Sequence, residues 1–499
     1  MLFLFRDNYK SIAELSAKEL RLGGLRIDPK TNIGSRVTYY NNVKIRNLKN
    51  QKSEISQVKG LPKNPKLRNI SWSPEQKRIA LTNTTETGVE LWVLELENGS
   101  VTKLTESNLN SNIGSVINWF SDSENMLVKM IPNNRRPLID TNKIVPDGPT
   151  ISTNFGEKAQ NRTYQDLLKN KFDEHNFEQL STSAIFKVSI DGSVKKWMDD
   201  GMYRTISFSP NGEYVMISQI NKPFSYLVTY SRFPTETNIY NKDGDFVSNL
   251  QKVPLIEELP KGFMSVRTGK RSFSWRPDKG ASLTYVTALD SGDPSKKVDF
   301  RDEVYELNYP FLGQGKFILK TINRFSGIDW GTKDMAIAYD TWWNTRNRKS
   351  YVFNPSNPNI KPKIISDRNY QDTYSDPGNF LRSRNEFNRS VLKMHYGNIF
   401  LRGQGFSPSG QFPFIDKVNT KTFEKTRVYQ SSYTDKIESI IDYDPKKNQL
   451  TVSIESPSEY PNYYTKKIKS GKLEKITDLK NPFLELQNVK KKKSPKEIS

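Results

Sequence analysis

The fold of this chain is decided by a short sequence motif that recurs along it. The motif reads ISWSPEQKRIALT at Ile70–Thr82 and ISFSPNGEYVMIS at Ile206–Ser218. Each copy has an aliphatic, a polar and an aromatic residue, then a turn, then a second apolar run. Apolar and polar residues alternate with a period of two, which is typical of strands with one buried face. Each copy therefore predicts two short antiparallel strands joined by a tight turn.

Further copies of the motif follow along most of the chain. They read INWFSDSENMLVKM (Ile117–Met130), FSWRPDKGASLTYV (Phe273–Val286), IDWGTKDMAIAYD (Ile328–Asp340), VLKMHYGNIFLRG (Val391–Gly403) and IDYDPKKNQLTVSI (Ile441–Ile454). The aromatic position is held by Trp72, Trp119, Phe208, Trp275, Trp330 and Tyr443, as expected of repeated core residues. Several copies continue into a third and fourth strand, such as ELWVLELENGSVTKLT at Glu90–Thr105. Repeated four-stranded antiparallel units are the signature of β-propeller blades.

The predicted fold is therefore an all-β propeller with seven or eight blades. Residues 1–56, which include the pair of short apolar runs in RVTYYNNVKIRNL, are interpreted as an incomplete first blade. Residues 57–480 are interpreted as the remaining blades, because one blade cannot bury both faces of its sheet alone. The Lys-rich stretch 481–499 is predicted to be a disordered tail.

Two segments depart from the repeat. The stretch Arg162–Leu180 has helix-like spacing at Tyr164, Leu167, Leu168 and Phe172, so a short helical insert is predicted at about residues 158–180. The stretch Asn344–Phe387 is polar and rich in Pro, Asn, Arg and Tyr, and it is interpreted as long inter-strand loops.

Composition narrows the function classes. The net charge is +21, but the 51 Lys and 25 Arg are spread over the whole length, which predicts a basic solvated surface and not a nucleic-acid interface. There is no Cys, so disulfides and thiolate sites are excluded. No stretch has the ~20 apolar residues of a membrane span, and the opening MLFLFRDNYK lacks the features of a signal peptide. The compartment remains unassigned.

A serine-hydrolase triad is not predicted in this sequence. The chain has two histidines, His175 and His395, and no serine has Gly two residues before and two after it. The stretch GFSPSG at Gly405–Gly410 is interpreted as a hairpin turn. No catalytic residues, no metal site and no cofactor are expected, because two isolated histidines without Cys do not form a zinc site. The Asp- and Asn-rich stretches near residues 241–245 and 442–448 are interpreted as turns.

Several longer stretches resemble a known family. They include GGLRIDPKTNIGSR (Gly23–Arg36), KPFSYLVTYSRFPTETNIYNKDG (Lys222–Gly244), SVRTGKRSFSWRPDK (Ser265–Lys279) and ESPSEYPNYY (Glu455–Tyr464). In consistent order over nearly the whole chain, they are similar to the glutamyl endopeptidase branch of the prolyl oligopeptidase family of serine peptidases, which includes the plant chloroplast enzyme and bacterial relatives. The resemblance covers the N-terminal β-propeller portion of that family.

The resemblance implies a function for the propeller. In the family, an α/β-hydrolase domain with the catalytic Ser, Asp and His follows a propeller that restricts entry to peptides or unfolded polypeptides. The chain is thus expected to be the non-catalytic, substrate-gating propeller of such a peptidase, truncated before the hydrolase domain that would be its partner. We hypothesise a frameshift at the lysine run KKKKSPKEIS (Lys490–Ser499) as the cause. Bacterial relatives often carry an export signal, which makes the cell envelope one expected location.

Relatives of this branch cut after Glu, so cationic side chains are expected to help bind the substrate carboxylate. The candidates are Arg232, Arg267 and Arg271, which lie in the most family-like segments.

Two alternative functions for the chain stay open from the residues alone. One is a free-standing propeller that binds peptides or proteins as a scaffold. The other is a propeller enzyme that uses carboxylates in its central funnel.

Overall fold

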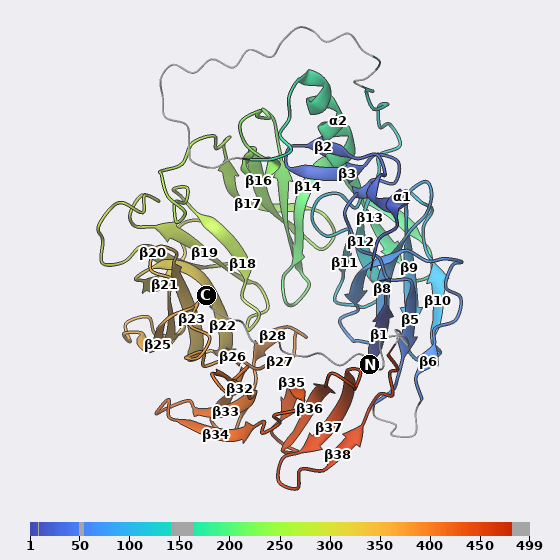
Figure 1. Ribbon diagram of the computed structural model, residues 1–499. Coiled ribbons are helices and arrows are strands. Elements are labelled where there is room, and N and C mark those ends of the chain that lie inside the picture. Colours follow the sequence, from blue (N-terminus) through green and yellow to red (C-terminus); the bar gives the residue numbers. More distant parts are fainter. Residues whose placement is uncertain (8, 49–53, 141–142, 144–163, 482–499) are drawn as a thin grey trace, which may run out of the picture. The chain divides into compact units, whose positions relative to one another are not determined.

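The computed structural model describes the chain except for residues 8, 49–53, 141–142, 144–163 and 482–499. The chain divides into two compact units, and each is described by itself. Unit 1 comprises Met1–Asp299 and Glu303–Phe317, and unit 2 comprises Phe300–Asp302 and the described residues from Ile318 onward. Strands dominate both units (Figure 1).

Unit 1 opens with small sheets and continues with larger antiparallel ones. The short helix α1 (Ile12–Leu15) is closed by a capping box between Ser11 and Glu14. The two small sheets are β1 (Leu2–Phe5), β5 (Asn42–Ile45), β6 (Ser56–Gln57), and β2 (Leu20–Leu22), β3 (Leu25–Asp28), β4 (Ile33–Gly34). The first four-stranded sheet is β7 (Leu67–Trp72), β8 (Arg78–Thr84), β9 (Val89–Glu95), β10 (Ser100–Lys103).

A seven-stranded sheet follows, and it consists of two four-stranded halves that share one strand. Its order is β11 (Ile117–Trp119), β12 (Asn125–Met130), β13 (Ser183–Ser189), β14 (Val194–Phe208), β15 (Tyr214–Ile220), β16 (Thr235–Asn241), β17 (Phe246–Val253). The long strand β14 pairs with β13 through its first half and with β15 through its second. The 3₁₀ turn η2 (Tyr230–Arg232) precedes β16. The next sheet has the order β18 (Arg271–Trp275), β19 (Ser282–Ala288), β20 (Asp302–Asn308), β21 (Lys316–Thr321).

Unit 2 contains three larger sheets and two hairpins. The first sheet is β22 (Arg324–Thr332), β23 (Met335–Trp342), β24 (Asn347–Phe353), β25 (Lys363–Asn369). The second is β26 (Asn379–Phe380), β30 (Asn398–Gly403), β33 (Phe414–Asn419), β34 (Lys425–Gln430), with β29 (Met394–His395) also on β30. The third, drawn in orange to red in Figure 1, is β35 (Ile437–Asp444), β36 (Gln449–Glu455), β37 (Asn462–Lys467), β38 (Leu473–Lys475). The hairpins are β27 (Arg382–Arg384) with β28 (Ser390–Leu392), and β31 (Phe406–Ser407) with β32 (Gly410–Gln411).

The repeated aromatic residues join successive sheets of unit 1. The indole N–H of Trp119 donates to the carbonyl of Ser71 at 3.1 Å, and that of Trp275 donates to the carbonyl of Ser207 at 2.9 Å. Each acceptor lies one residue before the aromatic position of an earlier copy of the motif. Five of the six aromatic residues predicted for the core are buried, but Trp72 is 42% exposed and does not belong to it.

The predicted fold class is confirmed: the chain is all-β, built from successive antiparallel sheets of four strands, with a short helical insert. The helix α2 (Lys171–Ser181) packs Phe177 and Leu180 against Leu22 and Ile27 of β2 and β3, which lie beside it in Figure 1. Its start differs from the prediction, because Asn170 caps it by accepting the backbone N–H of Asp173 at 2.9 Å.

Tyr164, Leu167 and Leu168 therefore precede the helix instead of forming its apolar face. The part of the predicted insert at 158–163 lies outside the described residues, as does nearly all of the predicted tail at 481–499. Among the described residues, no helix has the length and apolar character needed to span a membrane.

The interpretation of Asn344–Phe387 as long loops is wrong. This stretch contains strands β24 and β25, the third and fourth strands of the first sheet of unit 2. Both strands are rich in Arg, Lys and Asn, so they lack the apolar alternation by which strands are recognised. The pairing of β24 with the buried strand β23 holds them in the sheet.

Candidate functional site

The three predicted arginines are only partly brought together. Burial, and then the charge of Arg271, lower the pKa of Arg267, so these two guanidinium groups lie near each other. Arg267 also donates to the side-chain carbonyl of Gln251 at 2.7 Å and to backbone carbonyls. Arg232 lies instead over the ring of Tyr164, 5.3 Å from its centroid.

The two histidines lie apart from any catalytic arrangement in the described part of the chain. Nε2 of His175 is 2.9 Å from the backbone carbonyl of Pro137, and the ring of His395 lies against Tyr396. The predicted turn at Gly405–Gly410 is confirmed as the hairpin of β31 and β32. Within the described ranges, no group of three or more His, Asp or Glu side chains is arranged to hold a metal ion.

Unit 2 contains two neighbouring pockets that the sequence did not predict. One, here called the β25 pocket, has a volume of about 410 Å³ and is lined by residues of β24, β25, β26 and β34. The other, here called the β22 pocket, has a volume of about 590 Å³ and is lined by residues of β22, β27, β30 and β35. Tyr339, Arg348, Asn379 and Phe380 line both. The pockets therefore adjoin each other at the first two sheets of the unit, and the β22 pocket also reaches β35 of the third sheet.

The β22 pocket is built around a buried carboxylate. Asp329 is 7% exposed, accepts a hydrogen bond from the hydroxyl of Tyr339 at 2.7 Å and forms an ion pair with Arg382. Burial, and next the negative charge of Asp329, raise the pKa of the Tyr339 phenol. The hydroxyl therefore stays protonated and continues to donate to Asp329.

Arg402 and Asp442, which also line the β22 pocket, have internal partners as well. The guanidinium of Arg402 donates to the carbonyls of Ile440 and Ile441 at 3.1 and 2.5 Å. Asp442 pairs with Lys393 at 2.5 Å, and the same ammonium donates to the carbonyl of Tyr443. The charges of Arg402 and Asp442 are satisfied by other groups of the protein, so these interactions are suited to joining strands.

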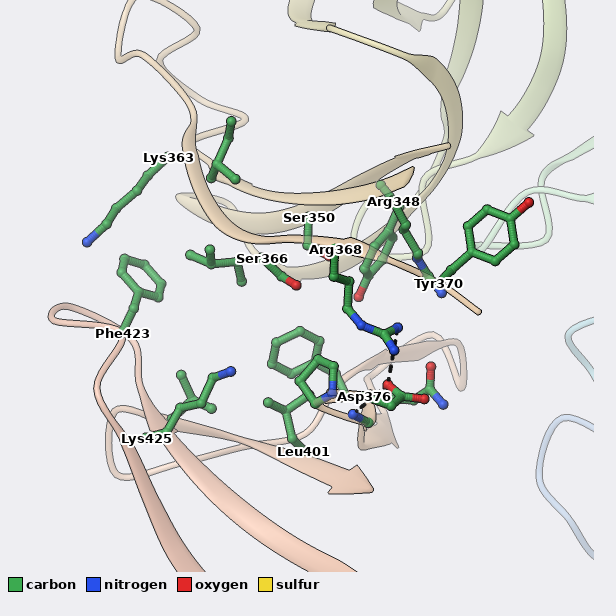
Figure 2. A pocket seen from close by; sticks show the side chains of 18 of the residues that line it. Arg348, Ser350, Lys363, Ser366, Arg368, Tyr370, Asp376, Leu401, Phe423 and Lys425 are labelled. Carbon is green, nitrogen blue, oxygen red and sulfur yellow. Dashed lines mark hydrogen bonds and ion pairs between the residues drawn. The ribbon is translucent and has the colours of Figure 1, made fainter. Parts of the chain in front are cut away.

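The β25 pocket has a different electrostatic character because arginines face each other across two strands. In the antiparallel pairing of β24 with β25, Arg348 lies opposite Arg368, and Ser350 lies opposite Ser366. Directly opposed residues of antiparallel strands project from the same face of the sheet. All four residues line the pocket (Figure 2).

Only one carboxylate lines the β25 pocket. Nη1 of Arg368 is 3.6 Å from Oδ1 of Asp376, the ion pair that Figure 2 marks with a dashed line. The side chain of Arg368 is 14% exposed, and its Nε is shielded from solvent without a hydrogen-bond acceptor among the described residues. Arg348 stacks on Tyr339, 4.7 Å from the ring centroid. A buried guanidinium N–H without an acceptor is unfavourable and is available to an incoming anion.

Two lysines and an aromatic ring complete the β25 pocket. Lys363 lies over the ring of Phe423 at 5.0 Å, and the two face each other in Figure 2. Lys425 enters from β34. The pocket thus holds four cationic side chains and one carboxylate, together with the apolar side chains of Ile364, Ile365, Phe380, Leu401, Val418 and Phe423. This arrangement can bind an anion that also has an apolar part.

Sequence reasoning missed this pocket for an identifiable reason. Arg348 and Arg368 lie in the stretch interpreted as loops, so no strand pairing is predicted for them from the sequence. The available signal was the third and fourth strand expected of every repeat, which predicts two strands after Ile328–Asp340. With that rule applied, the arginines would have been placed on adjacent strands.

The comparisons with known proteins support the resemblance found in the sequence. The chain is 32% identical over 519 aligned residues to a probable glutamyl endopeptidase, chloroplastic, of Oryza sativa subsp. japonica, and 30% identical over 524 to one of Arabidopsis thaliana. Each match includes 98% of this chain but 55% and 54% of the relative, so the chain spans about half the length of these proteins. No protein-family model matches the chain.

Solved structures with a similar arrangement have low identity. A prolyl endopeptidase structure matches 90% of this chain and 54% of its own, at 11% identity and a TM-score of 0.43. The β-propeller domain of the trilobed protease from Pyrococcus furiosus matches 84% of this chain and 98% of its own, at 10% identity and a TM-score of 0.37.

Proposed function

Because 98% of this chain is similar to proteins named probable glutamyl endopeptidase, we propose that it is the non-catalytic β-propeller of a glutamyl endopeptidase-like serine peptidase. Its role is to admit peptides or unfolded polypeptides to a serine hydrolase domain. The observation that carries the proposal is the extent of the match: nearly the whole chain is included, but only about half of each relative.

The described residues support a role without chemistry of their own. Neither histidine lines either pocket of unit 2, and no serine in the sequence lies in a Gly-x-Ser-x-Gly elbow. A serine peptidase needs a nucleophile, a base and an acid in mutual contact. Shape and the lining of its surfaces are sufficient for a domain that restricts access.

Covalent labelling tests the absence of catalysis directly. The purified chain is treated with a serine-directed fluorophosphonate probe and assayed against a fluorogenic glutamyl peptide. No labelling and no hydrolysis are expected. Hydrolysis that the probe abolishes would show that the chain carries a nucleophilic serine, and it would refute the proposal.

A role for Arg267 and Arg271 in substrate binding is part of the proposal. Their proximity concentrates positive charge at the start of β18, where a glutamyl carboxylate would be attracted. The test is the ratio of kcat/KM for a Glu and a Gln peptide, measured in a complete peptidase that contains this chain. Arg267→Ala, Arg271→Ala and, as the third candidate, Arg232→Ala are each compared with the unmodified protein. An unchanged preference for Glu in all three variants would remove these arginines from the account.

A further inference from the structure

The β25 pocket has no assigned role in the function proposed above. We propose that it binds an acidic polypeptide segment, in which two or more carboxylates flank a large apolar side chain. That the ligand is a peptide rests on the proposed function, whereas its acidic and apolar character is derived from the pocket alone.

The lining of the β25 pocket is positively charged. Arg348, Lys363, Arg368 and Lys425 line it, and Asp376 is the only acidic side chain among its lining residues. Asp376 pairs with Arg368 at 3.6 Å. In the described part of the chain, the other three cations have no carboxylate partner, and two of them rest on aromatic rings instead. The pocket therefore carries an excess of three positive charges that a ligand can neutralise.

Two of the cations, both arginines, lie directly opposite each other on adjacent strands. Like charges directly opposite each other on adjacent strands destabilise a sheet. Arg348 and Arg368 occupy such a pair, and Nε of Arg368 is shielded from water without an acceptor. A carboxylate between the two guanidinium groups would remove the repulsion and supply the missing acceptor. This arrangement is unfavourable for an empty pocket and favourable for one that holds an anion.

The β25 pocket also has an apolar lining. Ile365, Phe380, Leu401 and Phe423 line the same pocket as the cations. A small inorganic anion would leave this surface exposed to water, whereas a Phe or Leu side chain next to the carboxylates would cover it. The volume of about 410 Å³ lies within the usual range for ligand pockets. The four cations come from three strands, β24, β25 and β34, so they suit several separate carboxylates better than one compact group.

The experiment measures binding to the full chain by fluorescence anisotropy. The probe is a fluorescein-labelled pentapeptide that alternates Glu and Phe, and its matched control has Gln in place of every Glu. The acidic peptide is expected to bind at least tenfold more tightly, and its affinity is expected to fall with added salt. Equal binding of the two peptides, or no binding of the acidic one, overturns the inference.

Variants locate the binding. Arg348→Gln is expected to weaken binding of the acidic peptide by about tenfold or more, because one charge-assisted contact is lost. Arg346→Gln is the matched control: it removes the same charge two residues away, from an arginine that stacks on Trp343 and does not line the pocket. Melting curves establish that both variants fold. Equal weakening by both variants assigns the effect to net charge and overturns the inference.

Competition identifies the class of anion. Inorganic tripolyphosphate is added to the complex of the chain with the acidic peptide. If tripolyphosphate displaces the labelled peptide only at concentrations that raise the ionic strength substantially, the peptide assignment is supported. If tripolyphosphate displaces the labelled peptide at a lower concentration than the unlabelled peptide does, the assignment is contradicted. None of these measurements depends on hydrolysis, so the inference can fail while the proposed function stands. A chain that binds both peptides equally still behaves as a peptide-handling domain.

Discussion

Arg348 of β24 lies directly opposite Arg368 of β25, and only Arg368 has a carboxylate partner, Asp376. Most other charged groups buried in unit 2 are paired, as Asp329 is with Arg382 and Glu438 is with Lys466. The opposed arginine pair therefore differs from these groups, because one carboxylate serves two guanidinium groups. It is the feature of the described chain that most clearly calls for a ligand.

Removing one of these arginines is expected to cost little stability. Arg348→Gln relieves the repulsion from Arg368 but loses the stacking on Tyr339, and these two effects are of similar size. The free energy of unfolding, measured by urea denaturation, is expected to change by less than about 1 kcal/mol. A loss of several kcal/mol would mean that Arg348 is a structural residue.

A buried ion-pair cluster in unit 1 is expected to behave in the opposite way. Glu306 is 2% exposed and lies 3.0 Å from Arg276 and 2.5 Å from Lys279. Glu306→Gln leaves the buried guanidinium with less compensation, so a loss of about 3 kcal/mol in the free energy of unfolding is expected. Glu213→Gln breaks a pair with Lys242 that is half exposed, and it should cost under about 1 kcal/mol. Equal effects in the two variants would contradict this interpretation.

The same carboxylate is expected to make stability depend on acid. Burial raises the pKa of Glu306, but hydrogen bonds from Lys279 and Ser282 and the charge of Arg276 outweigh it, so the pKa is lower than in the unfolded chain. Its contribution is therefore complete above the unfolded value of about 4.3 and is lost as the pH falls through the lower folded value. Urea denaturation across this range should show a shallower acid dependence for Glu306→Gln than for the unmodified chain.

Lys129 is expected to cause a pH dependence on the alkaline side. It is 1% exposed, and burial lowers its pKa to about 7. Between about pH 7 and pH 10 the unfolded chain keeps a proton that the folded chain has released, so this group makes stability rise with pH. Lys129→Met should reduce that rise, by contrast with Lys77→Met, which removes a side chain that is 76% exposed. An identical slope in the two variants would mean that Lys129 stays charged when folded.

The sequence was sufficient for those parts of the fold in which apolar alternation reports burial. The copies at Ile117–Met130 and Ile206–Ser218 coincide with the paired strands β11–β12 and β14–β15, because each has one face in the core. It failed at β24 and β25, where both faces are largely polar and pairing with β23 decides the structure. It also failed at Trp72, which occupies the aromatic position but stays exposed.

The candidate site was less predictable than the fold. Arg232, Arg267 and Arg271 were chosen because they lie in family-like segments, and only the last two lie near each other. The arginines of the β25 pocket are 20 residues apart in the sequence and meet through strand register alone. Register depends on a bulge between Ser350 and Tyr351 that no pattern in the sequence indicates.

The most direct test of the proposed function is a chimaera in which this chain replaces the matched region of the rice relative. Labelling with a serine-directed probe establishes that the hydrolase portion is folded and competent. The chimaera is then compared with the same hydrolase portion alone, on a short glutamyl peptide and on a folded protein substrate. The account predicts that the chimaera cleaves the peptide but excludes the folded protein. Cleavage of both substrates at the rates of the portion alone would contradict a gating role for this chain.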